Sequence, residues 1–172
     1  MATFPEAGGR KLGRVDETFI KVRGQWMYLY RAVDGQGNTV EFYLSRTRGV
    51  AAAQAFFRKA LKDRPHPHSI TLDGHEPSHA ALRRMGMRGE FNFRGPNPVK
   101  IRSCPYLNNI VEQDHRRVKS RLQPMLGFKS FYNARRVITG IELAHKIHKR
   151  QFETLARLGT NPVAIWRHVL DA

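Results

Sequence analysis

Cysteine and long apolar runs are both scarce in this sequence of 172 residues. Cys104 is the single cysteine, so no disulfide can form within the chain, and a reducing, cytoplasmic location is expected. No stretch approaches the ~20 consecutive apolar residues of a membrane-spanning helix. The opening residues, MATFPEAGGRKLGR, also lack the apolar core of a secretory signal peptide. We therefore expect neither a disulfide framework nor a membrane partner.

Acidic residues are scarce as well. The sequence has 14 Asp and Glu against 30 Lys and Arg, which gives a formal net charge of +16. Such an excess predicts a polyanionic partner, because every phosphate that Lys or Arg neutralises releases condensed counterions. Residues 106–150 hold ten of the basic residues and three acids, Glu112, Asp114 and Glu142. We expect this part to face DNA, and an ordinary solvated helical face is the alternative.

The length fits one domain, and the order of predicted elements indicates a mixed α/β fold. A flexible lead over 1–13 precedes a domain at 14–152, and a tail over 153–172 follows it. Strands are predicted at 14–22, 25–33, 39–45, 69–72 and 99–102, and helices at 50–62, 77–85, 106–122, 130–152 and 162–170. Three antiparallel strands, a helix, a strand and then further helices fit the ribonuclease-H-like fold, a mixed sheet flanked by helices.

Asp16 lies in the first predicted strand, directly after Val15. Aspartate is depleted in strand interiors, and burial of a bare carboxylate is costly, so a metal ligand is one interpretation. The alternative is a strand face that happens to be solvated. Glu17 points to the opposite face and is expected to be such a solvated side chain.

Asp73 follows the short apolar strand SITL and precedes Gly74. α/β sheets often place functional groups just beyond the end of a buried strand. The alternative is that Asp73 caps the helix that begins near Pro77, which is a common use of aspartate.

Glu112 lies in the helix predicted at 106–122, with His115, Arg116 and Lys119 on the same face. The stripe offers an acid that could bind metal, followed by groups that could contact phosphate. The alternative is a solvated face with an i,i+4 pair of Glu and Arg. Mg²⁺ prefers oxygen ligands, and two such ions ~4 Å apart can activate an attacking oxygen and stabilise a leaving one.

Long phrases around these acids resemble one family. VDETFIKVRGQWMYLYRAVDGQGNTVEFYLS resembles the opening of the catalytic domain of bacterial DDE transposases, specifically the insertion-sequence-six family. YLNNIVEQDHRRVKSRLQPMLGFKSFYNARRVITGIE is similar to that family's Glu-containing helix and its continuation. SITLDGHEPSHAAL lies between them in the same order, so the resemblance covers roughly 14–152.

The resemblance implies a ribonuclease-H-like catalytic core for DNA transposition. Asp16, Asp73 and Glu112 would be the catalytic, metal-binding triad for two Mg²⁺ ions, with Mn²⁺ as a substitute. Water would hydrolyse a phosphodiester at the transposon end. The freed 3′-hydroxyl would then attack target DNA, with no covalent intermediate between protein and DNA.

The resemblance also implies DNA contacts and an assembly. Lys119 matches the family's basic residue seven positions after the Glu and would contact a DNA phosphate, with His115 and Arg116 as further DNA-binding candidates. The partners would be transposon ends and target DNA in the bacterial nucleoid. At least a dimer is expected, because two transposon ends must meet.

The sequence departs from the family in two places. The family has an N-terminal helix-turn-helix region that binds the terminal repeats, whereas only about a dozen residues precede the first strand here, so the chain resembles the catalytic part alone. His79 stands where an aromatic residue such as Tyr is expected. Two alternatives therefore stay open: a catalytically inactive, truncated relic that only binds nucleic acid, and a nuclease of the same fold. A cluster of His66, His68, His75 and His79 matches no firm zinc motif and is expected to be solvated.

Overall fold

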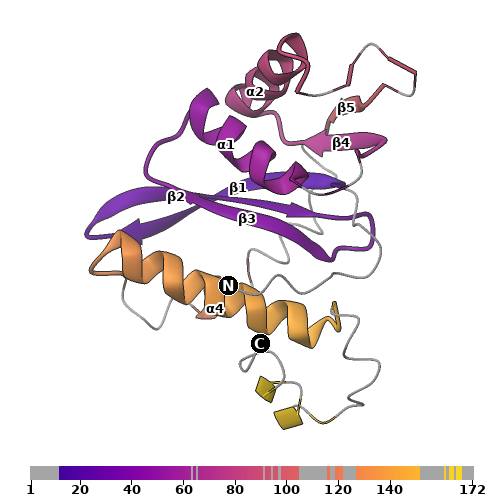
Figure 1. The fold of residues 1–172 in the computed structure, drawn as a ribbon. Coiled ribbons are helices and arrows are strands. Elements are labelled where there is room, and N and C mark those ends of the chain that lie inside the picture. Colours follow the sequence, from indigo (N-terminus) through magenta and orange to yellow (C-terminus); the bar gives the residue numbers. More distant parts are fainter. Residues whose placement is uncertain are drawn as a thin grey trace.

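A mixed sheet with helices on both faces forms the described part of the molecule (Figure 1). The computed structural model describes residues 12–62, 64, 66–90, 92–93, 95–96, 98–104, 116, 119–121, 127–151, 161, 163–164 and 166–167. The elements in chain order are β1 Arg14–Val22, β2 Gln25–Val33, β3 Thr39–Ser45, α1 Val50–Leu61, β4 Ser69–Leu72, α2 Glu76–Met87, β5 Lys100–Ser103 and α4 Phe131–His148. The five strands of the described part lie in the sheet in the order β3-β2-β1-β4-β5.

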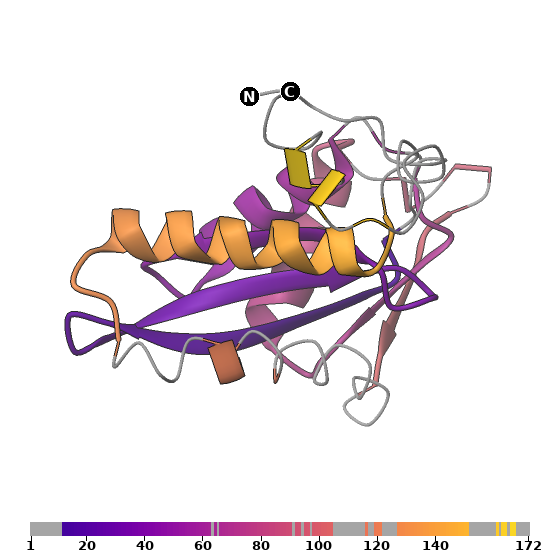
Figure 2. The same ribbon diagram turned by 90° about the horizontal axis from the view of Figure 1, so that it is seen from below.

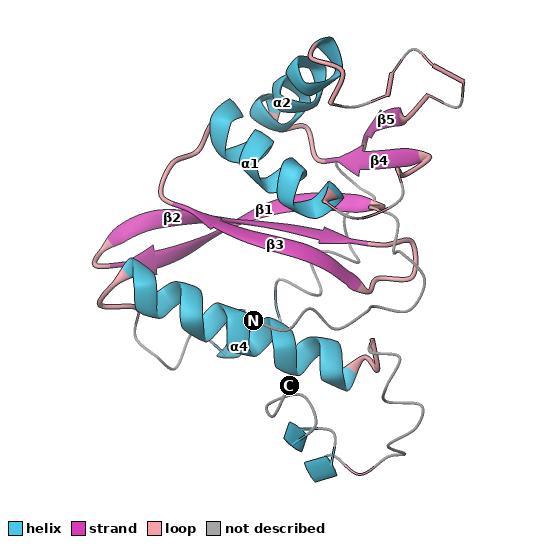
Figure 3. Ribbon diagram, viewed as in Figure 1, coloured by secondary structure: helices cyan, strands magenta, loops and turns pink. Residues whose placement is uncertain are grey.

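Two tight turns build the antiparallel meander of β1, β2 and β3 (Figure 3). Arg23 and Gly24 join β1 to β2 and both have positive φ, 51° and 77°, which matches the twist of a two-residue hairpin. In the next turn the Asp34 carboxylate accepts hydrogen bonds from the backbone N–H groups of Gln36 and Asn38, at 2.8 and 2.9 Å. These turns fix the register of the meander, and so fix which β1 side chains face each layer.

After α1 the chain returns to the sheet beside β1. β4 pairs with β1 in parallel, with Arg14 opposite Thr71 and Val15 opposite Leu72. A backbone hydrogen bond from Thr71 N–H to Gly13 O, at 2.8 Å, extends the pairing. β5 then adds to the other side of β4, also in parallel. The first strand is therefore central, with β2 on one side and β4 on the other.

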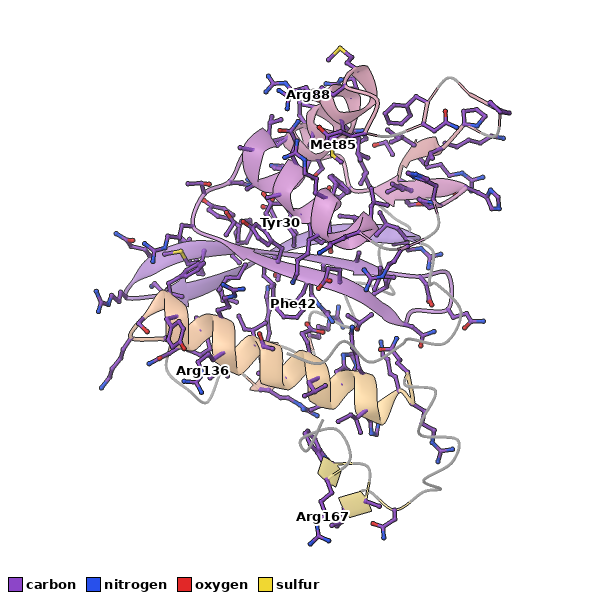
Figure 4. All side chains as sticks on the ribbon, viewed as in Figure 1. Tyr30, Phe42, Met85, Arg88, Arg136 and Arg167 are labelled. Atoms are coloured by element: carbon purple, nitrogen blue, oxygen red, sulfur yellow. The ribbon has the colours of Figure 1, made fainter. Side chains whose placement is uncertain are left out.

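The sheet face under α1 and α2 carries the larger apolar core. Val15 and Tyr30 from the strands pack there with Phe56 and Phe57 from α1 and Leu82 from α2. The rings of Tyr30 and Phe56 stack at a centroid distance of 5.6 Å, and Figure 4 shows Tyr30 between the sheet and α1. Full burial of each such side chain contributes roughly 1.5–3 kcal/mol, which fixes α1 on this face.

α4 covers the opposite face, where it lies along the meander (Figure 2). Ile20, Leu29 and Leu44 project from the strands toward Ala134 and Ile138 of the helix. These strand residues alternate in sequence with the residues that face α1, which is the period of two expected for a sheet buried on both faces. The side chains of β1 therefore point alternately toward the layer of α1 and α2 and toward α4.

A buried ion pair connects α4 to the sheet. Arg31 of β2 and Glu142 of α4 are 0% and 1% exposed, and Arg31 Nε lies 2.8 Å from Glu142 Oε1. Arg31 Nη2 donates a second hydrogen bond to Glu142 Oε2 at 3.0 Å, so the contact is bidentate. Removal of either residue would leave a fully buried charge without this bidentate contact, which is costly.

The predicted helices differ from the observed ones mainly at their ends. α4 ends at His148 rather than at 152, where Arg150 has a left-handed φ of 52°. Ser130 is its N-cap and accepts a hydrogen bond from Asn133 N–H at 3.1 Å. α2 runs over Glu76–Met87 rather than 77–85, with Pro at its N-terminus.

Some predicted elements lie mostly outside the described residues. Of the helix predicted at 106–122, positions 116 and 119–121 are helical, and of the one predicted at 162–170, positions 163–164 and 166–167 are helical. None of the helices that can be described has the length and apolar character to cross a membrane.

The Arg31–Glu142 pair generates a stability prediction. Substitution of Glu142 by Ala should lower the free energy of unfolding by about 3–5 kcal/mol, because it removes the bidentate carboxylate partner of a fully buried guanidinium. The Arg31→Met, Glu142→Leu double variant should be close to wild type, since both charges go together. Urea denaturation followed by circular dichroism measures both. A double variant as unstable as Glu142→Ala would show that the loss has another cause.

Candidate metal centre

Two of the predicted acids lie at adjacent parallel strands in the middle of the sheet: Asp16 is in β1, and Asp73 directly follows β4. Val15 is opposite Leu72, and the same register continued by one residue places Asp16 beside Asp73. Val15 and Leu72 are both in the core under α1, so alternation turns the two aspartates toward the opposite face. Both side chains are half-buried.

The two carboxylates affect each other electrostatically. Burial raises the pKa of Asp73, and the negative charge of Asp16 raises it further. The hydrogen bond from His75 N–H to Asp73 Oδ1, at 3.3 Å, acts in the other direction. Two half-buried carboxylates that repel each other form an oxygen-rich site suited to a hard divalent cation such as Mg²⁺. The residues present therefore fit the predicted metal.

Backbone and side-chain groups hold each aspartate in place. Asp16 Oδ1 accepts a hydrogen bond from Glu17 N–H at 2.8 Å. The Asp73 carbonyl oxygen lies 3.1 Å from His79 Nε2, so the imidazole N–H of α2 donates to it. The N-cap of α2 is His75, without a side-chain cap bond, so the interpretation of Asp73 as a helix cap is wrong. The histidine noted as a departure at position 79 thus supports the backbone of Asp73.

Glu17 corrects one sequence expectation. It lies on the opposite face from Asp16, as predicted, but its side chain is 3% exposed rather than solvated. Glu17 Oε1 forms an ion pair with Arg48 Nε at 2.6 Å, and Glu17 Oε2 lies 3.7 Å from His75 Nδ1. Burial and the charge of Glu17 together raise the pKa of Tyr30, its cross-strand partner. Glu17 is therefore the charged centre of a contact between β1, β2 and two loops.

The expectation that the four clustered histidines are solvated is wrong for two of them. His66 and His68 are exposed, but His75 and His79 are half-buried and contact Glu17 and Asp73. Within the described residues, no group of three His, Cys, Asp or Glu side chains is arranged to hold a metal ion. The predicted site therefore depends on a third ligand from elsewhere in the chain.

That third ligand, Glu112, lies outside the described residues, and so does His115. Arg116 and Lys119, the other two predicted DNA contacts, are helical and exposed, as a role in phosphate binding requires. The structure thus brings together Asp16 and Asp73, and it does not test where Glu112 lies relative to them.

Sequence reasoning missed Glu17, Arg48 and His75 as parts of the site. One signal for Glu17 was present, because it shares a strand face with the apolar Val15 and a charge on such a face is unusual. Nothing in the sequence connects position 17 with Arg48, which lies in the loop before α1, or with His75 at the start of α2.

Comparison with known proteins identifies relatives over most of this region. The sequence model of a family described as a DDE domain matches residues 11–151. The transposase for the insertion sequence-like element IS431mec of Staphylococcus aureus is 32% identical over 149 residues, which is 87% of this chain and 63% of that protein. The transposase for the insertion sequence element IS257 in transposon Tn4003, also from Staphylococcus aureus, matches with the same identity and coverage. The chain thus spans about 63% of the length of these curated relatives.

Solved structures share the fold. The magnesium complex of the HTLV-2 integrase catalytic core domain, in its trimeric form, matches with a TM-score of 0.51 and 16% identity, over 69% of this chain and 72% of that chain. This likeness confirms the predicted ribonuclease-H-like fold, which integrase cores share. At this level of identity it carries the fold alone.

The raised pKa of Asp73 predicts that the free energy of unfolding depends on pH. The folded-state pKa of Asp73 is raised, so the folded state binds its proton more tightly than the unfolded chain does. The stability from this proton is present below about pH 4 and is lost as pH rises through the folded-state pKa. Asp73→Asn should therefore stabilise the metal-free protein by about 0.5–2 kcal/mol at neutral pH, and the gain should vanish below pH 4. Urea unfolding in EDTA at both pH values measures this, and an Asn variant less stable at neutral pH would contradict it.

Proposed function

The chain belongs to the DDE transposase domain family of bacterial insertion sequences, and on that premise we propose that it catalyses metal-dependent cleavage and strand transfer of DNA. The observation that carries this proposal is the pairing of β1 with β4, which places two carboxylates side by side at the sheet centre. Asp16 and Asp73 supply two of the acids of such a site, and we assign the third to Glu112. We assign the catalytic unit to residues 14–152.

The proposed cofactor is Mg²⁺, held as two ions by the three acids, with Mn²⁺ as a substitute. Bound there, the metal would supply charge stabilisation for the attacking and leaving oxygens of an in-line phosphoryl displacement. The raised pKa of Asp73 supports this, because burial of its carboxylate, which is the main cause, and repulsion by Asp16 both disfavour a charge that a bound cation would stabilise. The HTLV-2 integrase catalytic core domain, which has the same fold, was determined in complex with magnesium.

The proposed substrate is DNA, both the ends of the element and the target. The net charge of +16 supports a polyanionic partner. Arg116 and Lys119 are exposed cations on the predicted Glu112 helix, and with His115 they would contact phosphates near the acids. We also propose a homo-oligomer of at least two chains. The HTLV-2 integrase catalytic core domain, which has the same fold, was determined in trimeric and dimeric forms.

The triad assignment predicts the effect of charge removal on activity. Asp16→Asn, Asp73→Asn or Glu112→Gln should each lower Mg²⁺-dependent strand transfer by about 10³-fold or more, because loss of a metal ligand removes several kcal/mol of transition-state stabilisation. The assay joins a precut end of the element to plasmid DNA, and EDTA should abolish it. Glu90→Gln is the matched control, since Glu90 pairs with Arg58 at the α1–α2 side of the molecule. Unchanged joining by all three variants would overturn the assignment, and cutting without joining would indicate a nuclease.

The DNA contact assigned to Lys119 has its own signature. Lys119→Ala should weaken binding to duplex DNA of any sequence and reduce the slope of log K against log salt by about 1. Lys62→Ala, which removes an exposed lysine just after α1, is the control and should leave the slope unchanged. Fluorescence anisotropy across a salt series measures both slopes. Equal slopes for the two variants would mean that Lys119 does not contact phosphate.

A further inference from the structure

Glu17 occupies an unusual place for a charged residue next to a metal site. It follows Asp16 in β1, projects to the opposite face of the sheet, and is 3% exposed. A carboxylate at this depth needs compensation, because burial of an unpaired charge costs several kcal/mol. The compensation comes from outside β1, and the groups that supply it lie next to the predicted metal ligands.

Arg48 anchors the Glu17 carboxylate from one side. Its Nε lies 2.6 Å from Glu17 Oε1, and its side chain is 41% exposed, so its charge is partly solvated. The guanidinium also lies over the ring of Phe19, two residues further along β1, at 5.4 Å from the centroid. Tyr30 lies opposite Glu17 on β2. These contacts fix the position of the carboxylate relative to the sheet.

The other carboxylate oxygen faces the loop that carries Asp73. Glu17 Oε2 lies 3.7 Å from His75 Nδ1, and the His75 side chain is 16% exposed. The backbone N–H of His75 donates to Asp73 Oδ1 at 3.3 Å, and the backbone N–H of Glu17 donates to Asp16 Oδ1 at 2.8 Å. The backbone of Glu17 therefore orients Asp16, and the backbone of His75 orients Asp73. The side chains of Glu17 and His75 contact each other.

We propose that Glu17 is a positioning residue, which holds His75, and through it the Asp73 carboxylate, at the orientation that binds metal together with Asp16. The inference rests on the proposed metal site and adds to it a pair of residues that touch neither metal nor DNA. The Glu17–His75 contact lies on the sheet face opposite the two aspartates and spans the strands that carry them. Its removal leaves β1 paired with β4 but frees the turn after β4, which carries the Asp73 carboxylate.

The experiment measures metal binding separately from folding. Mn²⁺ alone is titrated into the folded protein by calorimetry, and urea unfolding in EDTA gives the stability of each variant. Glu17→Ala should raise the Mn²⁺ dissociation constant by roughly 10–100-fold, the range for groups that orient metal ligands. Glu17→Gln keeps the volume and can still accept from Arg48, so it should retain most of the affinity. Glu90→Gln and Glu90→Ala, which alter the exposed Arg58–Glu90 pair, should leave the affinity unchanged.

A double-mutant cycle tests whether Glu17 acts through His75. His75→Ala should weaken Mn²⁺ binding as Glu17→Ala does, and the double variant should be no weaker than either single one, because both remove the same contact. Additive losses would overturn the proposal, and so would unchanged Mn²⁺ affinity in Glu17→Ala, even with reduced stability.

Asp16→Asn separates this outcome from failure of the proposed function. If the wild type binds Mn²⁺ and Asp16→Asn does not, the metal site stands, and the Glu17 variants decide the positioning role alone. If Asp16→Asn and the wild type bind Mn²⁺ equally, the metal site itself is wrong, and the positioning role falls with it.

Discussion

The parallel pairing of β1 with β4 is the contact on which the rest of this structure depends. The paired register covers two residue pairs, Arg14 with Thr71 and Val15 with Leu72. It nevertheless brings together two acids that are 57 positions apart in the sequence. β1 begins near the site and β4 ends there, so the elements around them must supply the rigidity that so short a pairing lacks. α1 and α2 do so through the apolar core on one face, and α4 does so on the other.

Each face of β1 carries a charged contact close to Asp16. On the face under α4, Arg31 is the cross-strand partner of Asp16 and is fully buried in its ion pair with Glu142. On the other face, Glu17 is buried against Arg48. Buried ion pairs contribute little net stability compared with apolar side chains of the same size. The buried Arg31–Glu142 pair, and the Glu17–Arg48 pair that is buried on its carboxylate side, are therefore better explained by the geometry that they impose than by the stability that they add.

Much of the sheet was predictable, because its determinants are local. The bounds of β1, β2 and β3 follow from alternation and from turn residues such as Gly24 and Asp34, whose backbone or side-chain chemistry acts within a few positions. The end of α4 at His148 was not predictable in this way, because the periodic pattern continues past Arg150, where the backbone leaves the helix. Local patterns thus give the elements, and contacts distant in sequence set where some of them stop.

The residues of the candidate site likewise fall into those that the sequence could predict and those that it could not. Asp16 and Asp73 could be proposed from the rarity of aspartate in and after apolar strands, and their proximity follows from the fold. Glu17 could not, since alternation assigns it a face but does not say which element covers that face. Its burial depends on Arg48, which follows the meander in the chain, and on His75, which follows β4. The residues that orient the predicted ligands are therefore distant in sequence and come together only in the complete sheet. For this reason their contacts cannot be predicted from local sequence patterns.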